Sequence, residues 1–202
     1  MRWLVIGAGG HAKVIIDSLT LDGVNDIHLL DDNLALKNKI IAGFKVKGTI
    51  AQWQDSQPDA VIVAIGNNQI RQQIVKTISI DDTHWQAVIH PRAIIAKSAT
   101  IGVGTAVMAG AIINADSRVG EHCIINTGTT IDHDCVIGNY VHVAPGVNVA
   151  GGVTVGNGSL LGIGSTILPN NHIGNNTVIG AGAIVVSNIP DGVTALGIPA
   201  TW

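Results

Sequence analysis

The fold is decided by residues 95–138, which read IAKSAT IGVGTA VMAGAI INADSR VGEHCI INTGTT IDHDCV IG. Each block of six begins with an aliphatic residue, and steps of six meet an aliphatic residue every time from Ile95 to Val185. The fifth residue of a block is usually small, as at Thr105 and Cys123. We therefore expect both positions to point into the interior of the fold.

A second period of 18 residues lies over the first, because a glycine recurs at Gly102, Gly120, Gly138, Gly156 and Gly174. An α-helix would need apolar spacings of three and four, and a half-buried strand would need strict alternation. A glycine at a fixed place in each repeat predicts a corner where the chain bends and a Cβ would clash. The sequence thus predicts a parallel β-helix of triangular section with roughly five coils. A structural rod or ice-binding surface would need a flat column of threonine, which this sequence lacks.

The residues before Pro91 have a different pattern. Strands that alternate with helical stretches predict a parallel sheet covered by helices. The strand-like segments are RWLVIG (2–7), IHLLDD (27–32) and DAVIVAIGNN (59–68), and QIRQQIVKTI (69–78) has helical spacing. We therefore expect two domains, a Rossmann-like α/β domain over residues 1–88 and the β-helix over residues 89–202.

Polar or glycine-rich loops follow each predicted strand. The turn GAGGHA, residues 7–12, precedes a helix whose first N–H groups would attract phosphate. Asp31 and Asp32 lie where a dinucleotide fold contacts ribose, and residues 66–68 follow the third strand. These loops should meet at one edge of the sheet. Residues 1–88 supply roughly one mononucleotide half, so one nucleotide fits better than NAD. The alternative is that the glycines only permit a tight turn.

Composition limits the possible partners. Charged residues make up only 12% of the chain and the net charge is -3, which argues against nucleic acid and against a polybasic membrane contact. We recognise no membrane span or signal peptide, so we expect a cytoplasmic protein. In that compartment Cys123 and Cys135 are expected to be buried thiols rather than a disulfide.

Two histidines interrupt the repeat. His133 lies between two inward positions and should therefore be on the outer side of its coil, beside Asp134. An imidazole accepts a proton near neutral pH, and an adjacent carboxylate stabilises the cation and fixes the tautomer. His142 stands in an otherwise apolar column. General-base catalysis is one interpretation, and ordinary surface or core histidines are another. A metal site, as in carbonic anhydrases of this fold class, is a third, although neighbouring residues of an extended chain point apart.

Several motifs together resemble the bacterial nucleotide-sugar acetyltransferases that join a small α/β domain to a left-handed β-helix. The motifs are GAGGHAKV, LLDD, VAIGNNQIR, IHPRA, INTGTTIDHDC and GAGAIVVSNIPDGVTALGIPA. The resemblance implies a homotrimer that acetylates the 4-amino group of a nucleotide-linked 4-amino-4,6-dideoxy sugar with acetyl-CoA. The UDP-linked sugar of bacillosamine synthesis is the first candidate. GDP-perosamine N-acetyltransferases and sialic acid O-acetyltransferases are similar, so the nucleotide and the choice between amine and hydroxyl stay open.

The same resemblance assigns roles to residues. His133 matches the general base, Asp134 the acid that raises its basicity, and Asn126 a residue near the sugar. His142 matches a histidine near the thioester. In a trimer it can come from a different subunit than His133, and which subunit supplies it to a given site stays open. The acetyl-CoA contacts are His142, Gly151, Ile163 and Ala181, and the nucleotide contacts are Gly9, Gly10, His11, Asp31, Asp32, Gly66 and Asn67. Relatives often end with a basic residue where this chain has Thr201 and Trp202, so no residue is assigned to the CoA phosphates.

The expected mechanism is direct transfer of the acetyl group. A backbone N–H of the corner 150–152, which contains Gly151, is a candidate donor to the oxyanion. Transfer through Cys135 would need an exposed thiolate, whereas that residue is at an interior position. No metal ion is expected. A nucleotide-binding scaffold without chemistry is the alternative from another class of protein.

Overall fold

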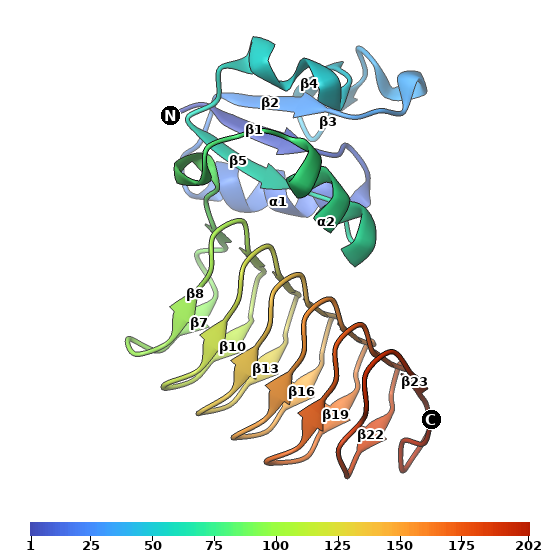
Figure 1. The fold of residues 1–202 in the computed structure, drawn as a ribbon. Coiled ribbons are helices and arrows are strands. Elements are labelled where there is room, and N and C mark those ends of the chain that lie inside the picture. Colours follow the sequence, from blue (N-terminus) through green and yellow to red (C-terminus); the bar gives the residue numbers. More distant parts are fainter.

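The computed structural model describes residues 1–202 and places an α/β domain at the N-terminal end of a long β-helix (Figure 1). The centre of the α/β domain is a five-stranded sheet of order β3-β4-β2-β1-β5, in which only β3 is antiparallel to its neighbour. Its elements are β1 (Trp3–Ile6), α1 (Gly10–Leu21), β2 (Ile27–Leu30), η1 (Leu34–Leu36), β3 (Ile40–Ile41), β4 (Phe44–Gly48), η2 (Ile50–Ser56), β5 (Ala60–Val63), α2 (Asn68–Thr77) and η3 (Asp82–His84).

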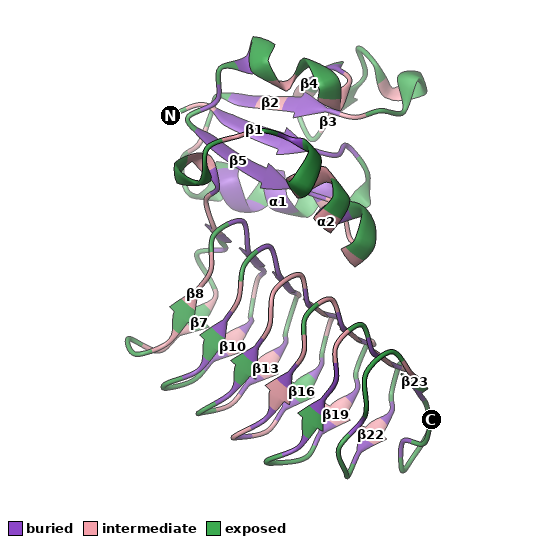
Figure 2. Cartoon of the chain, in the orientation of Figure 1, coloured by how far each residue is buried: buried purple, intermediate pink, exposed green.

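Alternate residues of β1 reach two separate cores. Trp3 and Val5 pack with α1 on one face of the sheet, while Leu4 and Ile6 pack on the side of α2 and η2. Because both faces are covered, β1 and β5 are continuous apolar runs, drawn as buried in Figure 2. The three predicted strands and the helix over residues 69–78 are confirmed. The sequence reasoning missed β4, although its apolar residues alternate with lysines in FKVKG.

The β-helix consists of two-residue strands stacked in three parallel sheets, which form the three faces of a prism. The first face contains β6 (Val88–Ile89), β9 (Ala106–Val107), β12 (Ile124–Ile125), β15 (His142–Val143), β18 (Leu160–Leu161), β21 (Val178–Ile179) and β23 (Thr194–Ala195). The second contains β7 (Ile94–Ile95), β10 (Ile112–Ile113), β13 (Thr130–Ile131), β16 (Asn148–Val149), β19 (Thr166–Ile167) and β22 (Ile184–Val185). The third contains β8 (Thr100–Ile101), β11 (Arg118–Val119), β14 (Val136–Ile137), β17 (Thr154–Val155) and β20 (His172–Ile173).

The two inward positions of each hexad build the interior of this prism. Aliphatic residues from Val107 to Val185 form one continuous core. The small residues add a second layer of hydrogen bonds between coils. Thr105 Oγ1 donates to the Gly120 carbonyl at 2.8 Å and accepts from the Cys123 N–H at 2.9 Å. Hydroxyls at four further interior positions also donate to carbonyls of the next coil, at Ser117, Thr129, Ser159 and Thr177. The Ser165 hydroxyl is the exception, because it is buried without a partner.

The repeat extends beyond the predicted coils at both ends, from β6 to β23. Each coil pairs residues 18 apart until the end, where Ile179 pairs with Ala195, 16 residues later. Because the last coil is two residues shorter, steps of six reach Asp191 instead of an interior residue. This contraction explains why the sequence pattern ended at Val185.

The recurring glycines lie where consecutive coils approach most closely. A Cβ on Gly102 would be 2.5 Å from the carbonyl carbon of Gly120, and one on Gly156 would be 2.6 Å from the Asn175 nitrogen. These glycines do not have positive φ angles, so the close approach of the next coil selects glycine here rather than unusual backbone angles. Asparagine side chains reinforce the same corner, since Asn157 Oδ1 accepts from the Asn139 N–H at 2.7 Å.

The two domains share a core. Val88, Ala106 and Met108 at the start of the β-helix pack in the same cluster as α1. The domain boundary that we propose, between residues 88 and 89, therefore lies within β6, where the chain enters the first coil. None of the helices has both the length and the hydropathy needed to cross a membrane.

Candidate active site

The loops that follow β1, β2 and β5 meet at one edge of the sheet, as predicted. The Ala8 N–H donates to Asp31 Oδ2 at 2.7 Å, and the Ala64 N–H donates to the Ile6 carbonyl at 2.7 Å. The paired strands are in register there, with Ile6 beside both Leu30 and Val63. This edge therefore collects the glycine turn, the two aspartates and the loop before α2.

The start of α1 presents free backbone donors at that edge. The N–H groups of Gly9, Gly10 and His11 have no acceptor within the chain. Gly9 and Gly10 are exposed, and a Cβ on either would have no atom within 4 Å. A helix start with open N–H groups and space beside it is suited to an anion such as phosphate.

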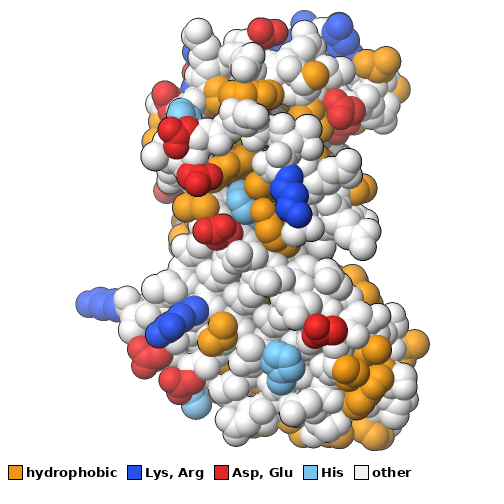
Figure 3. Space-filling view, viewed as in Figure 1, with side chains coloured by type: hydrophobic (Ala, Val, Ile, Leu, Met, Phe, Trp, Pro, Cys, Tyr) orange, Lys and Arg blue, Asp and Glu red, His pale blue; other side chains and the backbone are white.

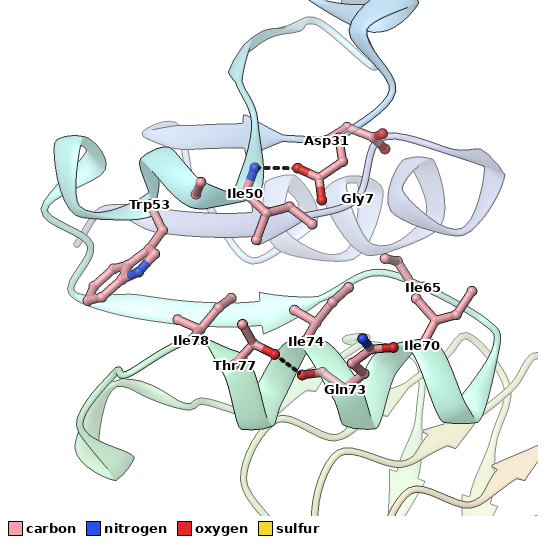
Figure 4. Close-up of a pocket in the computed structure, with 12 residues that line it drawn as sticks. Gly7, Asp31, Ile50, Trp53, Ile65, Ile70, Gln73, Ile74, Thr77 and Ile78 are labelled. Atoms are coloured by element: carbon pink, nitrogen blue, oxygen red, sulfur yellow. Dashed lines mark hydrogen bonds between the residues drawn. The ribbon is translucent and has the colours of Figure 1, made fainter.

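A cavity of about 520 Å³ opens beside these loops, between η2 and α2 (Figure 4). Its walls combine aliphatic side chains with Trp53 and the two aspartates. Both carboxyl oxygens of Asp31 already accept backbone N–H groups, from Ala8 and Asn33. Asp32 Oδ1 accepts from the Ile50 N–H at 2.9 Å. Asp31 thus stabilises the loops themselves, and Asp32 keeps one oxygen free for a ligand.

His142 links the first face of the β-helix to the loop before α2. Its Nδ1 is 3.2 Å from the Gly66 carbonyl, which can only accept, so Nδ1 donates. Asn126 Nδ2, 3.2 Å from Nε2, is then the donor to the second ring nitrogen. Burial, with the nearby Arg71 charge, lowers the pKa of His142 to about 4, so the ring is neutral near pH 7. The histidine thus has one defined tautomer.

Other predicted residues surround His142. Burial lowers the pKa of His11 to about 4, and the charges of His142 and Arg71 add to this effect. Gly66, Asn67 and His142 line a groove of about 280 Å³ together with Leu160 and Val178. The Asn67 side chain caps α2 by accepting from the Ile70 N–H at 3.0 Å, so its oxygen is already engaged.

His133 and Asp134 form a separate pair at the corner between β13 and β14. His133 Nδ1 donates to Asp134 Oδ2 at 2.8 Å, which leaves Nε2 as the acceptor of the neutral ring. The two side chains are 61% and 66% exposed. Hydrogen bonding to Asp134, and the nearby charge of Asp132, raise the pKa of His133 above its ordinary value. Asp132 also accepts the His133 N–H at 2.9 Å and holds the backbone of this corner.

Gly151 lies one coil further along, beneath the His133 ring. A Cβ at this position would be 2.6 Å from the ring carbon Cε1, so only glycine leaves room for the imidazole. The neighbouring N–H groups are engaged, since Gly152 donates to the His133 carbonyl and Ala150 to the Ile167 carbonyl. The Gly151 N–H has no acceptor in the chain. Gly151 is itself buried in the single chain, and its N–H is the donor of this corner that has no partner.

The predicted residues around His142 and those around His133 lie on opposite sides of the prism. His142 projects from the first face, whereas the His133 corner joins the second and third faces and is therefore opposite the first. Ile163 and Ala181 are exposed at another corner, between the first and second faces. One chain thus brings together His11, Gly66, Asn126 and His142, but it does not bring His133 to them. No three His, Cys, Asp or Glu side chains lie close enough to hold a metal ion.

Comparisons with known proteins support the assignment of both the α/β domain and the β-helix. Residues 2–78 match the family model described as PglD N-terminal domain, and residues 116–151 match the bacterial transferase hexapeptide model of six repeats. The structure of PerB from Caulobacter crescentus in complex with CoA and GDP-perosamine is 39% identical, with a TM-score of 0.91. The match covers 100% of this chain and 96% of that one.

The chain belongs to the family of sugar N-acetyltransferases that includes the perosamine N-acetyltransferase of Caulobacter crescentus. The acetyltransferase domain of PglB from Neisseria gonorrhoeae in complex with acetyl coenzyme A is another member, 36% identical over 99% of this chain and 98% of that one, with a TM-score of 0.92. UDP-N-acetylbacillosamine N-acetyltransferase from Bacillus subtilis is 40% identical over 120 residues, which are 52% of this chain. That alignment spans 50% of the curated relative's length. Membership of the family establishes the β-helix as left-handed.

Proposed function

We propose that this protein is an acetyl-CoA-dependent N-acetyltransferase that acts on the 4-amino group of a nucleotide-linked 4-amino-4,6-dideoxy sugar, with the UDP-linked sugar as the first candidate. The observation that carries the proposal is the exposed His133–Asp134 pair above Gly151, with Nε2 of the ring free to accept a proton. The open N–H groups of α1 and the cavity beside them suit the diphosphate and nucleoside of the acceptor.

In the proposed reaction the sugar amine attacks the thioester carbonyl directly. A carbon–nitrogen bond forms, and the amine proton passes to His133 Nε2. Asp134 stabilises the imidazolium through the Nδ1–H hydrogen bond. The Gly151 N–H donates to the oxyanion of the tetrahedral intermediate. Collapse of the intermediate breaks the carbon–sulfur bond, and His133 returns the proton to the leaving thiolate, which gives the amide and CoA.

We expect Asp134→Asn to lower kcat about tenfold and to move the acid limb of the pH profile to lower pH. The carboxylate raises the pKa of His133, so its loss lets the ring remain neutral at more acidic pH. CoA release should be measured from mildly acidic to mildly alkaline pH with one acceptor, because ionisation of the substrate amine then affects both enzymes equally. An acid limb at an unchanged pH would show that Asp134 does not act on the base.

We expect Cys135→Ala to keep most of the activity. Cys135 is fully buried, its thiol donates to the Ala150 carbonyl at 3.2 Å, and burial raises its pKa, so it is shielded and protonated. Steady-state CoA release, with a check that the variant is folded, tests this expectation. A folded but inactive variant would instead support a covalent route through an acetyl-cysteine.

We further propose that the enzyme is a cytoplasmic homotrimer. His133 and the acceptor loops of one chain lie on opposite sides of the prism, which supports a site shared between subunits. A neighbouring subunit would bring the His133 corner to the His142 side. The chain has no Lys or Arg after Arg118, and patches of hydrophobic side chains lie toward the lower right of Figure 3, at the C-terminal end. Within these 202 residues, a Lys or Arg that contacts the CoA phosphates would therefore lie in residues 1–118 of one subunit or another. Light scattering measures the stoichiometry.

A substrate panel tests the function. The acceptors are the 4-amino sugar linked to UDP, GDP or dTDP, together with the UDP-linked sugar that has a hydroxyl in place of the amine, and the readout is free CoA thiol. GDP-perosamine is the second candidate acceptor, because the PerB match covers the whole chain. Thiol release with the hydroxyl acceptor alone would indicate an O-acetyltransferase of the sialic acid type. Ligand binding without any thiol release would indicate a scaffold. His133→Ala serves as the control for every acceptor.

A further inference from the structure

Arg71 is a buried charge without a carboxylate partner. The residue lies on α2 and is only 1% exposed. Burial lowers its pKa to about 10, so the guanidinium is charged near pH 7. A buried charge is costly unless hydrogen bonds replace its hydration, and here the guanidinium donates only to neutral oxygens. The presence of this unpaired, buried guanidinium therefore needs an explanation.

Those oxygens belong to both domains. On the α/β side, Nη1 donates to the carbonyls of Ile65 at 2.9 Å and Gly66 at 3.3 Å, and Nη2 donates to Asn68 Oδ1 at 2.8 Å. On the β-helix side, Nε donates to the His122 carbonyl at 2.7 Å and Nη2 to the Tyr140 carbonyl at 3.1 Å. One guanidinium therefore joins the loop before α2 to two consecutive coils of the β-helix.

The Gly66 carbonyl connects this arrangement to the candidate active site. It accepts from Arg71 Nη1 and also from His142 Nδ1 at 3.2 Å. Asn68 extends the contact, because its Nδ2 donates to the Gly158 and Ser159 carbonyls at 3.0 Å. The position of the loop and the tautomer of His142 thus depend on the same oxygen atom.

We propose that Arg71 is a positioning residue that fixes the acceptor-binding loop, residues 65–68, on the β-helix in register with His142. This inference rests on the proposed function. A lysine at this place would keep the charge, but it lacks the planar fork of donors that reaches both domains at once. The geometry therefore predicts that the loss of Arg71 impairs use of the nucleotide sugar more than use of acetyl-CoA.

The guanidinium also acts on the histidines around it. Its positive charge contributes, after burial, to the low pKa of His11, His122 and His142. The other titratable groups near these residues are Cys123, Tyr140 and Asp82. Removal of the charge should therefore raise the pKa of His142, while a lysine should keep it low. This difference separates the geometric effect of Arg71 from its electrostatic effect.

The experiment compares Arg71→Met and Arg71→Lys with the wild-type protein, and uses Arg2→Met as the matched control. Arg2 is a half-buried arginine of the same domain, paired with Asp26 at 3.0 Å and donating to the Ser56 carbonyl at 3.2 Å, far from the loop 65–68 in its contacts. For Arg71→Met we expect the KM for the nucleotide sugar to rise about tenfold or more and kcat to fall, with the KM for acetyl-CoA within about threefold of wild type. For Arg71→Lys we expect a smaller rise of about threefold in the same KM. Arg2→Met should leave all three values unchanged.

Two measurements need no substrate, so they remain informative if the proposed acceptor is wrong. NMR titration of the His142 ring should show a higher pKa in Arg71→Met and an unchanged one in Arg71→Lys. Amide exchange of residues 65–71 should be faster in both variants. Equal rises of both KM values, or a lower Tm with unchanged kinetics and unchanged loop exchange, would overturn the proposal. If Arg71→Met does not fold, the lysine variant decides by its KM for the sugar and its loop exchange.

Discussion

His133→Ala should lower kcat by about two orders of magnitude or more while the protein stays folded. The side chain is 61% exposed and makes its hydrogen bond only to Asp134, so its removal takes little packing from the fold. The effect on catalysis is large because Nε2 is the acceptor proposed for the amine proton. CoA release at saturating acetyl-CoA and acceptor measures kcat, and the thermal unfolding midpoint checks the fold.

The matched control for this experiment is His172→Ala. His172 is also an exposed histidine of the β-helix, on β20 of the third face, and the proposed mechanism gives it no role. This control variant should retain wild-type kcat. Turnover of His133→Ala near the wild-type level would remove the assignment of His133 as the base, whatever the acceptor proves to be.

The β-helix could be predicted in detail because every coil packs against its neighbours in the same way and therefore needs the same residue types at the same positions. An inward aliphatic residue, a small fifth residue and a glycine at close approach are each set by neighbours one coil away. The prediction stopped short where this repetition stops, at the last coil, which pairs Ile179 with Ala195 after 16 residues. A search for residues at a fixed spacing of six or 18 cannot detect a coil that is two residues shorter than the others.

The α/β domain was less regular and was predicted less completely. The buried strands β1 and β5 are continuous apolar runs between turn residues, which makes them recognisable. In contrast, β4 depends on its pairing with β2, and its FKVKG pattern gives only a short alternation. The convergence of the loops was predictable because parallel strands place their C-terminal ends at one edge.

Within the candidate site, local pairs were predictable and long-range pairs were not. His133 and Asp134 are adjacent in sequence, so their contact follows from the residues themselves. His142 was singled out by its column, but its partner Gly66 is 76 residues away. Arg71 was missed, although it precedes Ile74 by three residues on α2 and so shares a side of the helix with an apolar residue. A charged residue at such a position is a signal of buried hydrogen bonding.

Mixing two inactive variants should restore activity if the active site lies between subunits. His133→Ala removes the base, and His142→Ala removes the ring that contacts Asn126 and the Gly66 loop on the opposite side of the prism. We expect each variant alone to retain a few per cent of activity or less. In randomly mixed trimers, about a quarter of the sites combine an intact His133 corner with an intact neighbouring His142 side, so activity should recover to about a quarter of wild type.

This recovery separates the two arrangements sharply. If each site were built within one chain, every chain in the mixture would carry one defect, and mixing would restore nothing. Co-refolding at equal ratio, with light scattering to establish the oligomer and CoA release as the readout, performs the test. The two variants should carry different affinity tags, and recovery of both tags in one oligomer after purification on a single tag shows that exchange between oligomers has occurred. With exchange shown in this way, a mixture as inactive as its two parents would contradict the shared site, and His133 would have to act at a place that its own chain provides.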